Sequence, residues 1–316
     1  MPDSFLFHAI VFYVSFLIVW AGSGLAIGEL AKLASSLKIS RFTLSFFLLG
    51  ILTSIPEMSI GINALALNDP SIIVGNLLGG VIVMFLLIIP LLALVGNGVR
   101  IPKEMQSKNI LLPLLVIIAP VFFLLDGVLS PSEGIFIILI YVLLFIFFVA
   151  KAGLVAKLKS KTMKRGNGKG KRLIKIGVGL VLIFLASNQI VNSTEYLASA
   201  LNWSPFLVSL LLVSIGTNIP ELSFVFRSIV SKKQDIAMAD YVGSAAANSL
   251  LFGVFAVVSQ TSIEIPSHFL LRFLFITLGL GLFTYFARSH KHLNRVEGAV
   301  LIGIYIMFFM SEILIS

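Results

Sequence analysis

Cysteine is absent from this chain, and charged residues are scarce, at 12% of its 316 residues. The absence of cysteine excludes disulfide bonds and thiolate metal ligands. An average soluble domain carries about 25% charged residues, so a water-soluble fold of this composition would have too few charges to cover its surface. The scarcity of charge therefore argues against a soluble protein.

Histidine is also rare. The four histidines are His8, His268, His290 and His292, and each falls near the end of an apolar stretch. This placement offers no histidine-based catalytic grouping, so we predict neither an enzyme nor a bound cofactor.

What the chain has in abundance is long apolar stretches, which together make 58% of its residues hydrophobic. An α-helix needs about 20 apolar residues to cross a bilayer core roughly 30 Å thick. Lipid favours helices because a helix forms the hydrogen bonds of its own backbone N–H and C=O groups. We therefore predict an all-α polytopic membrane protein with ten transmembrane helices. The predicted spans lie near residues 5–31, 42–67, 71–96, 109–126, 133–151, 173–200, 205–230, 236–259, 267–287 and 296–314.

The basic residues test this count. All but one of the 23 Lys and Arg residues lie in alternate gaps between the spans, while the intervening gaps and both termini carry none. Because Lys and Arg accumulate on the cytoplasmic side, we predict a multi-pass protein of the cell membrane with both termini outside. The exception, Arg272, lies inside the ninth span and requires a partner that the sequence does not identify.

The net charge of +9 has a membrane explanation. A nucleic-acid partner would require a basic face on a folded soluble domain, whereas these charges flank apolar spans, so we expect the lipid bilayer and no nucleic acid as partner. The most basic segment, residues 151–172, is predicted to be a flexible cytoplasmic loop; the alternative is a basic patch that holds anionic lipid.

An internal repeat organises the chain. One constant shift aligns Thr53, Ile55, Pro56 and Glu57 with Thr217, Ile219, Pro220 and Glu221, and no gap is needed between Ser23 and Gly79. Since each half has five spans, the second half must enter the membrane upside down. We predict a first five-helix repeat over 1–150, the basic loop over 151–172, and a second, inverted repeat over 173–316. Inverted repeats are typical of secondary transporters, which bind substrate near the membrane midplane.

Glu57 and Glu221 occupy equivalent positions at the centres of the two repeats. An ionised carboxylate in the membrane costs about 2.5 kcal/mol or considerably more, so two copies in register indicate a function. Two carboxylates balance one divalent charge, and hard cations such as Ca²⁺ prefer oxygen ligands. The sequence therefore predicts that inorganic cations are the transported substrates.

Further oxygen ligands are expected around the glutamates. Each preceding proline should kink its helix and free the carbonyl oxygen four residues back, at Leu52 and at Gly216. Hydroxyls of Thr53 and Thr217 lie one turn before the glutamates.

The span after each glutamate adds an asymmetric polar stripe. In the second half the stripe contains a residue of polar type at every fourth position, namely Asp240, Ser244 and Asn248. The corresponding positions of the first half are Asn76, Gly80 and Met84. The predicted site is therefore asymmetric.

These residues resemble the sodium/calcium exchanger family of the cation/calcium exchanger superfamily over essentially the whole chain. The resemblance rests on the segments Thr53–Glu57 and Gly216–Glu221, and on Gly75–Gly79 and Gly243–Ser244. It implies a Ca²⁺/Na⁺ antiporter working by alternating access. The ligand roles that it implies fall on Glu57, Glu221, Thr53 and Thr217, with Ser54, Asn218, Ser244 and Asn248 lining neighbouring Na⁺ sites.

This chain also departs from the family pattern. A serine and a polar amide of the first half are replaced by Gly80 and Met84, and a serine, an asparagine and an acidic residue of the second half are replaced by Asn218, Asp240 and Asn248. These departures leave the use of Na⁺ open. Desolvation disfavours the charged form of a carboxyl group, so exchange of Ca²⁺ or another cation for H⁺, with Asp240 as a relay, is the first alternative. A non-transporting membrane scaffold or cation sensor is the second.

Overall fold

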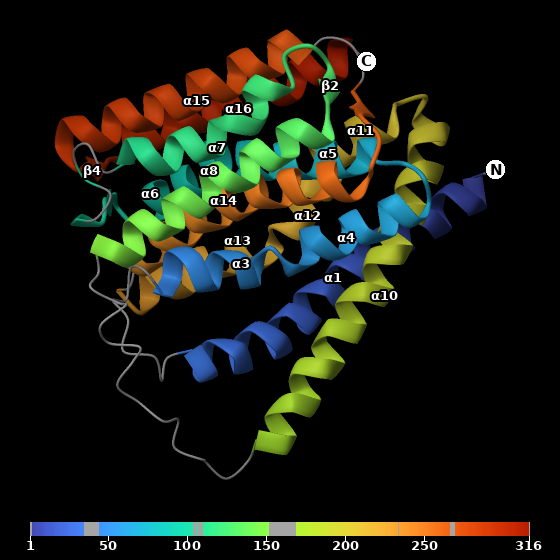
Figure 1. Ribbon diagram of the computed structural model, residues 1–316, viewed down its shortest axis with the longest axis horizontal. Helices are drawn as coiled ribbons and strands as arrows, with labels where there is room; N and C mark the ends of the chain where they lie inside the picture. The colour runs from blue at the N-terminus through green and yellow to red at the C-terminus, as the bar shows by residue number, and fades with distance from the viewer. Residues whose placement is uncertain are drawn as a thin grey trace.

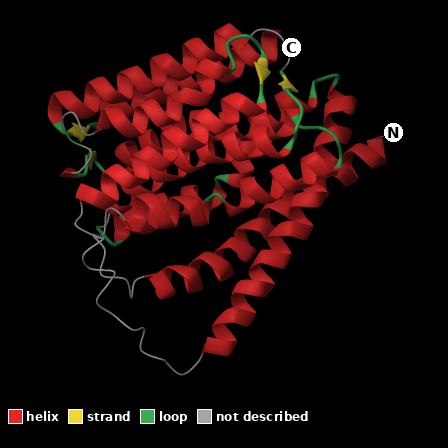
Figure 2. Cartoon of the chain, in the orientation of Figure 1, coloured by secondary structure: helices red, strands yellow, loops and turns green. Residues whose placement is uncertain are grey.

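A computed structural model describes residues 2–34, 44–103, 106, 110–151, 169–232, 234–265 and 269–315. Helices account for nearly all of these residues (Figure 2). Most of the predicted basic loop, from 152 to 168, lies outside the described residues, so its structure and its cytoplasmic location stay predictions.

The elements follow the predicted spans closely (Figure 1). Up to residue 151 they are α1 (Pro2–Ala34), the π-helix η1 (Leu44–Leu49), α3 (Gly50–Thr53), α4 (Ile55–Ala66), α5 (Ser71–Val83), the π-helix η2 (Met84–Ile88), α6 (Ile89–Val95), β1 (Val99–Arg100), α7 (Leu111–Phe123), β2 (Val128–Leu129) and α8 (Pro131–Lys151). From residue 169 they are α10 (Lys169–Leu201), α11 (Pro205–Val208), the π-helix η5 (Ser209–Val213), α12 (Ser214–Thr217), α13 (Ile219–Val230), α14 (Gln234–Val258), β3 (Ile263–Glu264), α15 (Phe269–His290), β4 (His292–Leu293) and α16 (Arg295–Ile315).

The helices are long and apolar enough to span a membrane. Among the described residues, 8 helices pass on length and hydropathy alone, and Ser45–Thr53 with Ile55–Ala66 makes a ninth span that bends by 41°. The remaining predicted span corresponds to α7, whose 13 residues reach only about 20 Å at 1.5 Å per residue. An all-helical membrane protein is thus confirmed, while the count of ten spans stays a prediction.

The structure carries the same constant offset as the sequence. α4 and α13 are each 12 residues long and start at positions 55 and 219, and α8 and α16 start at 131 and 295. Two short antiparallel strand pairs, β1 with β4 and β2 with β3, join the first half of the chain to the second half. Under the same offset β1 corresponds to β3 and β2 corresponds to β4, so the two strand pairs exchange under the repeat. The division into repeats over 1–150 and 173–316 stays a prediction.

The centre of the bundle is formed by α14 and by the continuous span Ser71–Val95. Of the most apolar 18 residues, 72% are buried in α14 and 78% in Ser71–Val95. The corresponding share is 28% in α8 and in α16. α14 approaches the first half closely because a Cβ atom on Gly243 would overlap the backbone of Phe46, and one on Gly50 would overlap the backbone at Gly243. Small residues allow helix backbones to come together in this way. α1 and α10 cross at the side of this core (Figure 1).

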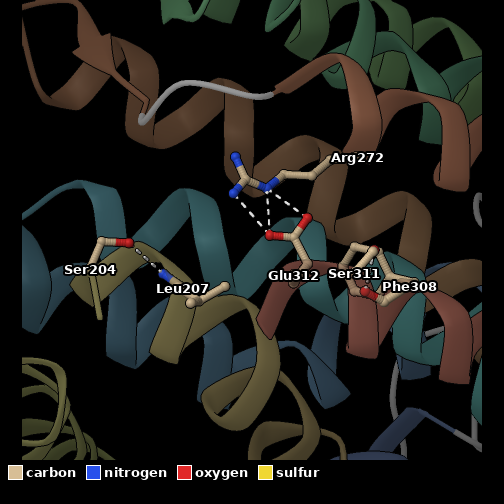
Figure 3. A network of polar contacts seen from close by, with 6 residues as sticks. All are labelled: Ser204, Leu207, Arg272, Phe308, Ser311 and Glu312. Atoms are coloured by element: carbon tan, nitrogen blue, oxygen red, sulfur yellow. Dashed lines mark hydrogen bonds and ion pairs between the residues drawn. The ribbon is translucent and has the colours of Figure 1, made fainter. Parts of the chain in front are cut away.

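Arg272 finds its partner in α16 (Figure 3). Its Nη2 and Nε atoms donate to the carboxylate of Glu312 at distances of 2.9–3.1 Å, and both residues are buried. The guanidinium carbon also lies 4.7 Å from the centre of the Phe206 ring in α11, a geometry that adds a cation–π attraction. The ion pair therefore joins α15 to α16 beside the start of α11.

Because this pair is buried, removing one member should destabilise the protein strongly. We expect Arg272→Leu or Glu312→Leu to lower the free energy of unfolding by about 3–5 kcal/mol, since each leaves one charge uncompensated. The double leucine variant should regain most of this loss, because apolar side chains can replace a buried pair at little net cost. Thermal unfolding of the purified protein in detergent measures both effects. A double variant as unstable as either single variant would contradict the interpretation.

Candidate cation-binding site

Each predicted glutamate follows a break in its helix. α3 ends at Thr53 and α12 ends at Thr217, and the next residue, Ser54 or Asn218, has φ and ψ of −82° and 7° or −90° and 11°. These angles lie near the bridge region that often occurs at functional sites. The chain then enters a new helix in both halves.

The prolines start these new helices. Pro56 and Pro220 occupy the first turn of α4 and α13, where a missing N–H group is tolerated. Glu57 and Glu221 consequently also lie in a first turn, where the helix dipole stabilises negative charge. The sequence correctly predicts a disruption here, but its form is a break followed by a restart.

The sequence predicts free carbonyl oxygens at Leu52 and Gly216. The N–H group of Ser54 donates to the carbonyl of Gly50 at 3.3 Å, and those of Ser54 and Asn218 lie near the carbonyls of Leu52 and Gly216. The use of these two carbonyl oxygens as ligands stays a prediction.

The two carboxyl groups are buried without partners. Glu57 and Glu221 are each 1% exposed, and among the described residues none of their four carboxyl oxygens has a hydrogen-bond partner. The side chains of Thr217 and Thr53 lie beside Glu57 and Glu221 respectively, but outside hydrogen-bond geometry. Buried polar groups are normally satisfied, so four open oxygens indicate a place for a ligand.

Neutral oxygen atoms surround the two glutamates. Ser244 of α14 lies 3.4 Å from the hydroxyl of Thr53 and 3.4 Å from that of Ser54. Ser54 also donates to Oδ1 of Asn248, at 3.3 Å. The polar stripe predicted on α14 therefore meets the helix break of the first half.

The second break meets α5 in the same way. The Thr217 hydroxyl donates to Oδ1 of Asn76 at 3.3 Å, and the amide of Asn218 donates to the Ser214 carbonyl at 2.7 Å. Oδ1 of Asn218 is buried and has no partner among the described residues, so it is one more available oxygen.

Side chains of the second half fill the space beside Gly80, one of the three first-half positions Asn76, Gly80 and Met84. A Cβ atom on Gly80 would lie 2.7 Å from Nδ2 of Asn248 and 3.6 Å from Nδ2 of Asn218. Asn248 and Asn218 both replace other residue types of the family pattern, and they fill the space beside Gly80, which replaces a serine of that pattern. Because Nδ2 of Asn248 has no partner among the described residues, and amide N and O exchange by a half-turn, this position can present an oxygen to a cation.

All ten predicted site residues are buried, but they do not form one cluster of acidic ligands. Among the described residues, no three His, Cys, Asp or Glu side chains could hold one metal ion together. Asp240, Glu221 and Thr53 line one cavity of about 380 Å³. That cavity is lined by Trp20, Ala21, Ser23, Gly24, Leu49, Thr53, Pro220, Glu221, Ser223, Phe224, Arg227 and Asp240.

The equivalent region of the other half has a second cavity of about 360 Å³, whose lining includes Ser59 and Phe184 but not Glu57, and it carries an asparagine bridge. Asn188 of α10 donates to Asn63 of α4 at 3.1 Å, and Asn63 donates to the carbonyls of Ser59 and Phe184 at 2.9 and 3.4 Å. Positions 63 and 188 are the repeat counterparts of Arg227 and Gly24, which line the cavity. The two halves therefore differ: one cavity includes Glu221 in its lining, whereas the other does not include Glu57 and has the asparagine bridge beside it.

Two serines were not predicted as site residues. Ser23 and Ser187 are buried in α1 and α10, and neither hydroxyl has a partner among the described residues. They are counterparts of one another in the repeat, so the repeat alignment contained a signal for them that their ordinary residue type concealed.

Comparison with known proteins agrees with this architecture. In curated relatives, an inner membrane protein, YrbG, of Escherichia coli is 27% identical over 221 residues, which cover 67% of this chain and 68% of the relative. A putative antiporter, CaxA, of Alkalimonas amylolytica is 24% identical over 300 residues, covering 92% and 93% of the two chains. A solved structure of the sodium-calcium exchanger NCX_Mj matches with a TM-score of 0.69 at 22% identity, covering 97% of this chain and 99% of that one. This last similarity concerns the fold.

A family model provides the assignment. The model described as sodium/calcium exchanger protein matches residues 7–150 and 172–313, which is most of both halves. With the helical membrane fold and the buried glutamate pair already in view, the match identifies this chain as a member of the sodium/calcium exchanger family.

Proposed function

We propose that this protein exchanges Ca²⁺ for Na⁺ across the cell membrane at a site centred on Glu57 and Glu221. The observation that carries the proposal is the four buried carboxyl oxygens without hydrogen-bond partners among the described residues. Two carboxylates match the charge of one Ca²⁺ ion, and Ca²⁺ takes six to eight oxygen ligands. Thr53, Thr217, Asn76 and Asn218 provide neutral oxygens around the pair.

The movements of Ca²⁺ and Na⁺ are coupled because both ions use the same two carboxylates. A Ca²⁺ ion that binds both glutamates leaves no carboxylate for monovalent ions, and bound Na⁺ ions exclude Ca²⁺ for the same reason. Exchange then requires that the site open to one side at a time. A cavity on the Arg227 side and an asparagine bridge at the counterpart positions support such alternating access.

The orientation is part of the proposal. The alternation of Lys and Arg along the sequence assigns the loop after Arg227 to the cytoplasm, with both termini and the bridge formed by Asn63 and Asn188 toward the outside. The cavity would then be the cytoplasmic route, and the repeats would be 1–150 and 173–316 on either side of the basic loop 151–172.

The central test is Ca²⁺ flux. We expect proteoliposomes loaded with Na⁺ to accumulate ⁴⁵Ca²⁺ when diluted into Na⁺-free buffer, and we expect Glu57→Gln or Glu221→Gln to reduce the rate by on the order of a hundredfold, because each removes one of two charged ligands. Glu264→Gln, which changes an exposed glutamate in β3, is the matched control and should retain the rate.

Other outcomes select the alternatives. Uptake driven by a pH gradient without Na⁺ would replace Na⁺ by H⁺ as the coupling ion. A cation-dependent rise in thermal stability without any flux would indicate a cation sensor. Full uptake in Glu57→Gln would disprove the two-glutamate site.

The asymmetry of access can be measured separately, because the chain contains no native cysteine. We expect Ser23→Cys, which lines the cavity, to react faster with a small methanethiosulfonate reagent than Ser187→Cys, its repeat counterpart. Adding Asn63→Ala removes the bridge to Asn188 and should increase the reactivity at position 187. Equal rates at 23 and 187 in the starting variants would show that the bridge does not control access.

A further inference from the structure

Asp240 is a buried carboxyl group that the two-glutamate mechanism does not use. It is 2% exposed, its Oδ1 atom has no hydrogen-bond partner among the described residues, and it lines the 380 Å³ cavity together with Glu221. A buried carboxyl oxygen without a hydrogen-bond partner is unfavourable unless water or a cation reaches it. The feature is therefore a candidate binding position outside the central pair.

Comparison of the two repeats shows that only the second repeat has a carboxyl group at this position. The counterpart of Asp240 is Asn76, whose Oδ1 accepts a hydrogen bond from Thr217 and which does not line the cavity. The counterpart of Arg227 is Asn63, which is bonded to its own helix and to α10. Two amides of the first half are thus replaced by an acid and a base, and both line the same cavity.

The cavity has room for a hydrated ion. A water molecule occupies about 30 Å³ in the liquid, so a cation with six waters needs roughly 180 Å³, well within the volume of the cavity. The lining includes the hydroxyl residues Ser23, Thr53 and Ser223 and the aromatic residues Trp20 and Phe224. Water molecules can be among the six to eight oxygen ligands of Ca²⁺, and Mg²⁺ usually keeps several waters while binding through one or two carboxylates.

We propose that Asp240 forms a second cation-binding position, which holds a partly hydrated divalent cation in the cavity between Arg227 and the Glu57–Glu221 pair. Arg227 is exposed and Glu221 is buried, so a cation that enters past Arg227 meets Asp240 in the same cavity that reaches Glu221. Arg227 opposes cation binding there by its positive charge, and Asp240 offsets it. The counterpart region around Asn76 has no such position among the described residues.

This inference rests on the proposed function, but its test does not require transport. The chain contains two tryptophans, Trp20 in the cavity wall and Trp203 elsewhere, so Trp203→Phe leaves one reporter beside the proposed position. Tb³⁺, a luminescent substitute for Ca²⁺, is sensitised by energy transfer from a nearby tryptophan. The measurement is tryptophan-sensitised Tb³⁺ luminescence of the full-length protein in nanodiscs, in a Trp203→Phe, Glu57→Gln background that weakens the central site.

For three variants in this background, we predict the direction in which Tb³⁺ binding changes. Asp240→Asn, which installs the residue of the other repeat, should weaken Tb³⁺ binding by on the order of tenfold, because affinity follows the number of charged ligands. Arg227→Asn should strengthen it, because a repelling charge is removed. Adding Asn76→Asp to Asp240→Asn should not restore binding, since position 76 lies outside the cavity lining.

The outcomes are distinguishable from those of the flux assay. Loss of flux in Glu57→Gln together with Asp240-dependent luminescence supports both proposals. Loss of flux with luminescence that Asp240→Asn leaves unchanged would overturn the second position and leave the central site intact. Absence of sensitised luminescence in this background would also overturn the second position.

Discussion

The constraint on which this structure depends is the burial of two carboxyl groups at the centre of a membrane protein. Glu57 and Glu221 are each 1% exposed and lack hydrogen-bond partners among the described residues. Such groups are tolerated in a membrane only where the surroundings or a ligand compensate them. The helix breaks at Ser54 and Asn218, and the prolines that restart the helices, place both carboxyl groups in first turns, where the local dipole favours them.

The packing around the site follows from this requirement. α14 must approach the first half closely enough for Ser244 and Asn248 to reach Thr53 and Ser54, and the absence of a side chain at Gly243 allows it. Lipid offers no hydrophobic drive for helix association, so close packing and interhelical hydrogen bonds provide the stability. The same contacts that stabilise the bundle therefore assemble the oxygen atoms of the site.

The sequence predicted the helical membrane fold because apolar stretches leave a clear signal, whereas the binding site stays a prediction. Ten apolar stretches coincide with the observed helices or runs of helices, and all ten predicted site residues are buried. What the sequence could not predict depends on contacts between distant residues. Arg272 and Glu312 are 40 residues apart in the chain, and the fit of Asn248 beside Gly80 involves opposite halves. The sequence also did not predict that each helix ends before its proline and restarts, because a proline in the sequence does not distinguish a kinked helix from two consecutive helices.

The departures from symmetry carry functional meaning because the repeat provides an internal standard. Two identical halves would give a cation the same electrostatic environment on both routes to the glutamates. In this chain one route has Arg227 and Asp240, and the other has Asn63 and Asn76. A charged pair acts over a longer range than two amides and responds to ionic strength, so under the proposed function we expect the two routes to differ in how strongly they attract and retain cations. An exchanger built in this way has unequal faces even though its two helix frameworks are nearly equal.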